Sequence, residues 1–424
     1  MNQPEISKQD REILRDLARR QAGLAASDVN RERIALWYDH NDGHGSRPMI
    51  HLELGTFAHE VISPLLRCST HAARQIEMNL YNNFANQEFF DDDRVTPDYY
   101  PVCYDSDFRL FNLDVKVEHT SDADGNTSLG HHFVSQITDL EEDYPKLQAT
   151  RYEASAGTLA DKIAFLTDLF GDILPVRPEM GCLYCVPTQY LLHIMSMETM
   201  MYSLYDYPDL FRKMMNRIAE DTNAYYRMLE KKGLIWPTVG HNPLGQGSWC
   251  YTRELPGEEE AKKRPLTTRD VWGFLDSQET VGISPEMYEE FIFPCYREIA
   301  QNYGRLSYGC CEPVHPIWKN CLSKLPNLRK LSISPWCDEA YMGEQLRGTN
   351  IIYHRKPSPN FLGVGATLDE DAFRDHIRAT VRAAKGCKLE ITQRDVYTIN
   401  HDISKARRFV QIIREETEDA YSLT

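Results

Sequence analysis

The chain has 424 residues, of which 42% are hydrophobic and 26% charged, so it is long enough for one barrel with insertions or for two to three smaller domains. Its formal net charge of −16 disfavours nucleic acid and anionic membranes as partners. No apolar run reaches the roughly 20 residues of a bilayer span, and the N-terminus lacks a signal-peptide pattern. Together with an odd number of cysteines, 11, these features predict a cytoplasmic protein.

Residues 1–45 are predicted to form a helical extension that precedes the main domain. Ser7, with Asp10 three residues later, can cap a helix that ends near Gly23. The apolar run at residues 48–54 then suits a central strand and places Glu53 near its carboxyl end.

Between about residues 99 and 155 the pattern changes to alternating apolar and polar residues. Two such stretches, 108–118 and 132–137, flank a polar turn at residues 121–126. This pattern predicts a β-hairpin inserted into the main domain.

After residue 230, short apolar runs alternate with amphipathic helices about six times, which predicts a parallel sheet with helical crossovers. No Gly-x-Gly-x-x-Gly or Walker loop is present, so a (β/α)8 TIM barrel over residues 46–424 is favoured over a dinucleotide-binding sheet. The predicted strands are residues 234–236, 271–275, 306–308, 328–333, 350–353 and 388–392.

In such a barrel, the residues just after each strand converge on one mouth. Polar and aromatic side chains are concentrated at these positions in the sequence. They are Glu53, His241, Asp276, Gln278, Glu279, Cys310, Cys311, Glu312, Trp336, Arg355, Lys356, Arg394 and Asp395.

The strand at residues 306–308 is followed by Gly-Cys-Cys-Glu-Pro, which carries the thiols and the carboxylate that zinc takes as ligands. Strand alternation would point Cys310 and Glu312 to the same side. A catalytic zinc typically has three protein ligands, and a third would come from elsewhere at the mouth. The candidates for it are Cys311, Glu279 and Asp395.

Each of these residues also has a structural interpretation. Adjacent cysteines are often small core residues, and Glu312 could form an ion pair with Arg355 or Arg394. The sequence alone leaves these alternatives open.

Aromatic and cationic residues at the mouth suggest a substrate site. Trp336 follows a predicted strand and could form a flat wall, and Tyr251 belongs to a long loop, residues 245–256, of the kind that covers a site. His241 lies just before this loop. Arg355 and Lys356 could anchor an anionic group.

Two segments resemble the uroporphyrinogen decarboxylase superfamily: residues 274–299, beginning Phe-Leu-Asp-Ser-Gln-Glu-Thr, and residues 195–211, ending Leu-Tyr-Asp-Tyr-Pro-Asp-Leu-Phe. The resemblance covers roughly residues 48–416. The Gly-Cys-Cys-Glu-Pro, Ser-Pro-Trp and Arg-Lys-Pro set resembles the corrinoid-dependent methyltransferase and O-demethylase branch. That branch carries a His-x-Cys zinc motif where this chain has Tyr308-x-Cys310, and Asp395 lies near the place of its last-strand cysteine. The Arg-rich segment of true decarboxylases is replaced by Gly-Thr-Phe-Ala-His after Leu54.

The resemblance implies a zinc-assisted methyltransferase of anaerobic one-carbon metabolism. It would move a methyl group from a small methylated substrate, with an aryl methyl ether as one candidate, to the cobalt of a cobalamin carried by a partner corrinoid protein. The implied catalytic residues are Glu312 and Glu279, the metal ligands Cys310, Cys311, Glu312 and Asp395, and the substrate contacts His241, Tyr251, Trp336, Arg355 and Lys356.

Two other functions stay open at this point. One is a metal-independent decarboxylase of a small acid or tetrapyrrole, and the other is a non-catalytic binder of a tetrapyrrole or corrinoid. The sequence also leaves open whether the protein forms a homodimer.

Overall fold

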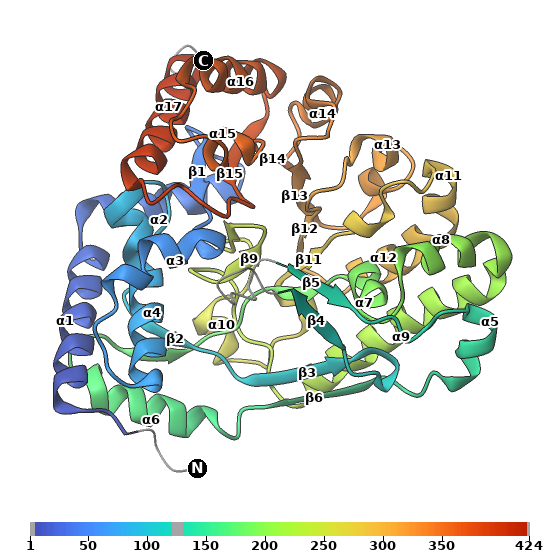
Figure 1. The fold of residues 1–424 in the computed structure, drawn as a ribbon, viewed down its shortest axis with the longest axis horizontal. Coiled ribbons are helices and arrows are strands. Elements are labelled where there is room, and N and C mark those ends of the chain that lie inside the picture. The colour runs from blue at the N-terminus through green and yellow to red at the C-terminus, as the bar shows by residue number, and fades with distance from the viewer. Residues whose placement is uncertain (1–4, 121–129, 422–424) are drawn as a thin grey trace.

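A seven-stranded parallel sheet forms the centre of the protein, which a computed structural model describes for residues 5–120 and 130–421 (Figure 1). Because all seven strands are parallel, their carboxyl ends lie at the same edge. This confirms the predicted α/β class. In spatial order the strands are β1 (Met49–Leu52), β15 (Lys388–Gln393), β14 (Ile352–Arg355), β13 (Leu328–Ile333), β12 (Arg305–Tyr308), β11 (Trp272–Leu275) and β8 (Leu183–Cys185).

The free edge of β1 is satisfied by two carboxylates instead of an eighth strand. The backbone N–H groups of Ile50 and Leu52 donate to the side chains of Asp93 (2.8 Å) and Asp92 (2.9 Å). At the other end, the chain enters β8 from β7 (Val176–Pro178), which pairs with β2 (Tyr100–Val102). No ladder joins β1 to β8 in the described residues, so the closure of the predicted (β/α)8 barrel is not established.

Residues 234–236, predicted as a strand, do not join the sheet. The backbone N–H of Trp236 lies 3.0 Å from the sulfur of Met180 instead of pairing with a neighbouring strand. A short hairpin follows, formed by β9 (Pro243–Gly245) and β10 (Ser248–Trp249), and its tip lies against the sheet interior, since Gly247 O is 2.7 Å from His51 Nδ1.

The N-terminal helices α1 (Lys8–Ala25) and α2 (Asp28–Asn41) are integrated into the fold. Ser7 caps α1 as predicted, accepting the Asp10 N–H at 3.0 Å, but the helix continues two residues past Gly23. The Asp10 carboxylate instead accepts bonds from the backbone and hydroxyl of Ser69. Helix α1 packs against α4 (His71–Ala85) and α6 (Leu159–Phe170).

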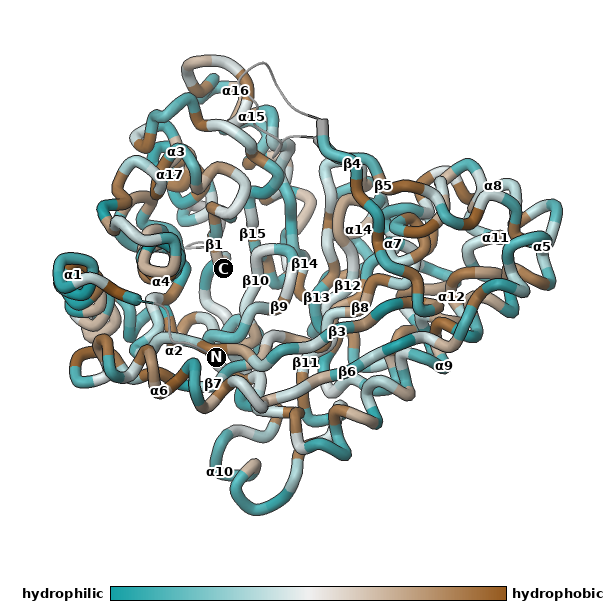
Figure 2. Tube along the Cα trace, turned by 60° about the horizontal axis from the view of Figure 1, so that its bottom comes forward, coloured by the Kyte–Doolittle hydropathy of each residue, from teal (hydrophilic) through white to brown (hydrophobic). Residues whose placement is uncertain are grey.

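Helices cover the sheet: α9 (Pro208–Lys231), α12 (Phe293–Ala300), α14 (Glu339–Leu346), α16 (Glu370–Ala383) and α17 (Ile403–Tyr421). Hydrophobic and hydrophilic residues alternate along α9 in Figure 2, as expected for a helix with one buried face. None of the described helices is long and apolar enough to cross a membrane. The remaining α-helices are α3 (Ala58–Val61), α5 (Leu140–Asp143), α7 (Pro187–Leu192), α8 (Met197–Asp206), α10 (Glu258–Ala261), α11 (Pro285–Met287), α13 (His315–Trp318) and α15 (Asn360–Gly363).

The inserted segment contains two antiparallel pairs. β3 (Asp105–Arg109) pairs with β6 (Arg151–Ser155), and β4 (Val117–Thr120) pairs with β5 (Gly130–Phe133). The predicted strand at 108–118 is broken because Phe111 and Asn112 adopt left-handed backbone angles, with φ of 53° and 57°. The predicted turn at 121–126 lies outside the described residues, and the domain boundaries stay a prediction.

Charged side chains occupy the sheet interior below the strand ends. Lys330 Nζ lies 2.7 Å from Glu390 Oε2 and 2.6 Å from Ser248 Oγ. His354 Nε2 is 3.3 Å from Glu390 Oε1. Burial alone would raise the pKa of Glu390, but His354 and Lys330 hold it well below its usual range.

Candidate functional site

Polar side chains from five neighbouring strands meet where the strands end, and we call this group the strand-end site. Because the strands are parallel and in register, residues that follow them converge without any long-range sequence signal. The strand-end site consists of Glu53 after β1, Asp276 after β11, Cys310, Cys311 and Glu312 after β12, Lys356 after β14, and Arg394 and Asp395 after β15.

Glu312 ties the ends of β11 and β12 together. Its Oε1 accepts the Ser277 N–H at 3.0 Å and its Oε2 accepts the Cys310 N–H at 2.8 Å. The chain can turn back toward these amides because Gly309 has a φ of 98°, a conformation that other residues rarely adopt. Glu312 is fully buried, and this burial raises its pKa in spite of both hydrogen bonds.

Asp276 is a buried carboxyl group without a hydrogen-bond partner. Its side chain is 1% exposed, and neither carboxylate oxygen has a partner among the described residues. Burial raises its pKa to about 9, and the nearby carboxylates of Glu312 and Glu279 add to the effect. Asp276 is therefore neutral at pH 7 and can donate a proton.

Glu279 lies behind Asp276 in the turn that follows β11. Its Oε2 accepts the Thr188 hydroxyl at 2.8 Å, and burial raises its pKa. The Glu279 carboxylate therefore lies on the α7 side of Asp276 and helps to raise the pKa of Asp276.

The two adjacent thiols form a hydrogen bond with one another. Cys310 Sγ and Cys311 Sγ are 3.4 Å apart. The hydrogen bond from Cys310 to Cys311, together with burial, raises the pKa of Cys310, and the same bond lowers the pKa of Cys311. Cys311 is thus the sulfur that ionises first, and Arg394 favours its thiolate form.

Two cations face the thiols. Arg394 pairs with Glu53 (Nε to Oε2, 2.8 Å), donates to Gln246 Oε1, and approaches Cys310 Sγ at 3.6 Å. Lys356 is buried, with Nζ 3.2 Å from Ser332 Oγ, and burial lowers its pKa to about 8. An anionic group of a substrate would find both charges here.

The predicted metal ligands do not form a three-residue set. Cys311 contacts both Cys310 and Asp395, the latter at 3.7 Å, whereas Glu312 is committed to backbone amides. Among the described residues, no group of three or more His, Cys, Asp or Glu side chains is arranged to hold a metal ion. The described residues therefore show no preformed zinc site, and zinc binding stays a prediction.

His241 and Tyr251, predicted to contact substrate, lie deep in the sheet interior. The His241 ring stacks on Trp249 with centroids 4.2 Å apart, and the Tyr251 hydroxyl is 3.4 Å from His241 Nδ1. Burial holds the pKa of His241 well below its usual value, so the ring is neutral. Tyr251 also stacks on Trp37, which places both residues in a packed aromatic cluster.

Arg355 is buried against α14, whereas Trp336 is exposed to solvent. Arg355 turns toward α14, where Nη2 lies 2.6 Å from Glu339 Oε1 and Nη1 donates to the carbonyls of Ile333 and Ser334. Its guanidinium group is therefore absent from the strand-end site. Trp336 is 72% exposed just after β13 and remains free to contact a ligand.

Two parts of the site carried no functional prediction. Tyr184, in β8, is 47% exposed and its ring stacks on that of Phe274, with centroids 4.8 Å apart. Gln246, at the tip of the β9–β10 hairpin, reaches Arg394. The glycines on either side of it, Gly245 and Gly247, could have marked this position in the sequence. Both have a positive φ, and a Cβ atom at Gly247 would lie 2.6 Å from the Thr392 side chain.

Comparison with known proteins gives limited information. No protein-family model and no curated protein matches the sequence. Among solved structures, the fold is similar to a methyltransferase from Methanosarcina mazei, with 11% sequence identity, a TM-score of 0.48, and 90% of this chain and 97% of that chain covered. A similarity of this size assigns no function to the chain.

Proposed function

We propose that the protein transfers a methyl group from a small methylated substrate to the cobalt of a corrinoid carried by a separate protein. The observation that carries this proposal is Asp276, a neutral buried acid without a partner, beside two cations and a thiol pair. In this proposal the sheet is a (β/α)8 barrel of uroporphyrinogen decarboxylase-like type, in which Asp92 and Asp93 complete the edge of β1.

Demethylation of an ether requires help for the leaving oxygen. When the bond between methyl carbon and oxygen breaks, its electron pair stays on oxygen, and the Asp276 carboxyl proton moves to that oxygen. A reduced corrinoid carried by the partner protein would supply the electron pair for the new bond to the methyl carbon. Asp276 is left as a carboxylate, which Arg394 stabilises until a proton returns from solvent.

Substrate position follows from the charges around Asp276. Lys356 and Arg394 would hold a carboxylate or phenolate of the substrate, and the Tyr184 ring, stacked on Phe274, would face a planar group. An aryl methyl ether with an acidic group meets both requirements. The resemblance of the sequence to corrinoid-dependent methyltransferases supports the choice of acceptor.

Zinc assistance is a separate part of the proposal. Because the predicted ligands form no three-residue set, the proton-transfer step is derived from Asp276 alone. Metal analysis of the purified protein, followed by activity measurement after chelation, tests this part. Stoichiometric zinc that disappears in a Cys310→Ala/Cys311→Ala variant would establish it.

The main experiment is an anaerobic assay with a ¹³C-methyl ether, a reduced corrinoid protein and NMR detection of both products. We expect methyl transfer that depends on the corrinoid protein and falls about 10²–10⁴-fold in Asp276→Asn. Asp371→Asn, on the exposed side of α16, is the matched control and should have full activity. No transfer to any corrinoid acceptor, with the protein folded, would contradict the proposal.

Decarboxylation of a small acid is a second candidate, because the same neutral acid could protonate the carbon that loses CO2. Lys356 and Arg394 would then bind the second carboxylate of the substrate. Release of CO2 without any corrinoid protein would favour this reaction over methyl transfer.

A further inference from the structure

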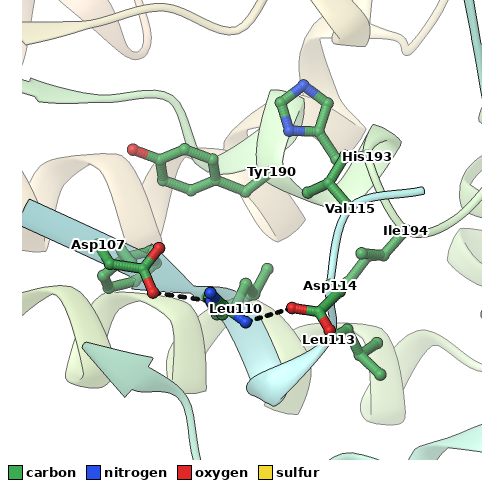
Figure 3. A pocket seen from close by; sticks show the side chains of 10 residues that line it. Asp107, Leu110, Leu113, Asp114, Val115, Tyr190, His193 and Ile194 are labelled. Carbon is green, nitrogen blue, oxygen red and sulfur yellow. Dashed lines mark hydrogen bonds and ion pairs between the residues drawn. The ribbon is translucent and has the colours of Figure 1, made fainter. Parts of the chain in front are cut away.

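A separate group of cavities lies between β8, the insertion strand β3 and helix α9. Two adjoining cavities of about 220 and 170 Å³ share the lining residues Ser106, Tyr184, Tyr225 and Tyr226. We call these two together the β8 cavity. Each is several times the roughly 30 Å³ that one water molecule occupies. A third cavity, of about 330 Å³, shares Phe108 and Tyr190 with the smaller one (Figure 3).

Six aromatic residues are among those that line the β8 cavity: Tyr104, Phe108, Tyr184, Tyr190, Tyr225 and Tyr226. Phe108 lies 5.5 Å from both Tyr190 and Tyr225, measured between ring centroids. The Tyr226 hydroxyl is held by Tyr303 at 2.7 Å. The rings are therefore held in place by their neighbours, and aromatic rings that line a cavity attract a positive charge.

The charged side chain that lines the β8 cavity is acidic. Glu179 lines it and is 7% exposed, its Oε2 accepting the Tyr99 hydroxyl. Its other oxygen, Oε1, accepts no hydrogen bond from the residues that the structure describes, and burial raises the pKa of Glu179 to about 7. No lysine or arginine lines either cavity. In the neighbouring third cavity, Arg109 is already paired with Asp107 and Asp114 (Figure 3).

We propose that the β8 cavity binds a small organic cation with a methylated ammonium group, held against the tyrosine rings with Glu179 as counter-ion. An anion would meet no positive group in this wall, whereas a cation would stabilise the ionised form of the buried Glu179. A primary ammonium group needs several hydrogen-bond acceptors to replace its water, whereas a methylated one needs few and favours aromatic faces.

The proposed cation site shares Tyr184 with the strand-end site but can be tested apart from the reaction there. Tyr184 touches both regions, since it lines the β8 cavity and stacks on Phe274 of β11. Glu179 is neither the proposed proton donor nor one of the two cations of the strand-end site. Loss of cation binding and loss of methyl transfer can therefore be measured separately.

The test is isothermal titration of the full-length protein with choline and with 3,3-dimethylbutan-1-ol, which has the same shape but a carbon in place of the nitrogen. We expect one molar equivalent of choline to bind, and the neutral analogue to bind at least 10-fold more weakly. Equal binding of the two compounds, or no saturation by choline, would overturn the proposal.

Variants locate the site. Glu179→Gln and Tyr225→Leu should each weaken choline binding about 10-fold or more, whereas Tyr225→Phe, which keeps the ring, should bind within about 2-fold of the wild type. Glu153→Gln, an exposed carboxylate on nearby β6, is the matched control. Thermal unfolding checks that each variant is folded. Because Tyr225→Leu and Tyr225→Phe differ only in the ring, unchanged affinity in both would exclude the β8 cavity even if Glu179→Gln failed to fold.

Discussion

Two buried carboxylates in the same sheet have opposite protonation states. Glu390, in the sheet interior, lies 2.7 Å from the Lys330 ammonium, and its pKa is held well below the usual range. Asp276, at the strand ends, is equally buried but has no hydrogen-bond partner, and its pKa is raised to about 9. Burial is common to both, so the difference comes from the partner. The interior charges stabilise the fold, whereas the strand-end carboxyl group is left available for chemistry.

The largest effect is expected when the interior pair is broken. Lys330→Met should leave Glu390 as a buried carboxylate without its cation and lower the free energy of unfolding by about 3–5 kcal/mol. Urea denaturation followed by circular dichroism measures this change.

The double variant Lys330→Met/Glu390→Met should recover most of that loss, because no unpaired charge is left in the interior. Lys262→Met, which breaks an exposed pair with Glu259, is the control and should change the stability by less than about 1 kcal/mol. A single variant as stable as the double one would show that the interior pair contributes nothing.

A substitution at the strand ends should change the free energy of unfolding in the opposite direction. Asp276→Asn should make the protein more stable at pH 7, by about 2–4 kcal/mol, because Asp276 must take up a proton on folding. The measurement is again urea denaturation, compared between pH 5 and pH 7.

The pH dependence follows from the direction of the pKa shift. Between the unfolded pKa, near 3.8, and the folded pKa of about 9, the native state binds one more proton than the unfolded state. Stability therefore falls as pH rises through this window, and the gain from Asp276→Asn should be about 3 kcal/mol larger at pH 7 than at pH 5. A gain that does not change with pH would mean that Asp276 is ionised in the folded protein.

The sheet could be predicted from the sequence because its strands are short apolar runs that alternate with capped helices. The edges of the sheet could not. The side chains of Asp92 and Asp93 accept the N–H groups of β1, and the Asp93 N–H donates to the Ile50 carbonyl, so a short non-strand segment takes the place of a strand. Such a contact with β1 has no local sequence pattern. The left-handed backbone of Phe111 and Asn112 likewise broke a stretch whose alternation indicated one strand.

The location of the strand-end site was predictable, since it needed only the strand ends. The direction in which each side chain points was harder to predict. Glu312 was expected to face a metal or an arginine, but two backbone amides are closer, and Gly309 allows the turn that brings them there. Arg355 and Lys356 are adjacent in the sequence, yet strand alternation sends them to opposite sides of β14.

Lys356 gives a moderate expected effect on the proposed reaction. Lys356→Met should lower kcat/KM for an anionic substrate about 10-fold, mainly through KM, because one of two cations facing the substrate is lost. Steady-state kinetics with an anionic substrate and its methyl ester measure it, and the ester should show little difference between variant and wild type. An equal loss for both substrates would mean that Lys356 does not contact the anionic group.

The smallest effect is expected for Arg355→Lys. On the helix side of β14, the guanidinium group bridges Glu339 and the carbonyls of Ile333 and Ser334, so a lysine keeps the charge but loses part of this geometry. The free energy of unfolding should fall by about 1–2 kcal/mol. KM for the same anionic substrate should stay unchanged, since the side chain does not face the strand-end site. If KM rose as much as in Lys356→Met, both cations would have to reach the substrate, and the division of β14 into a catalytic and a structural side would be wrong.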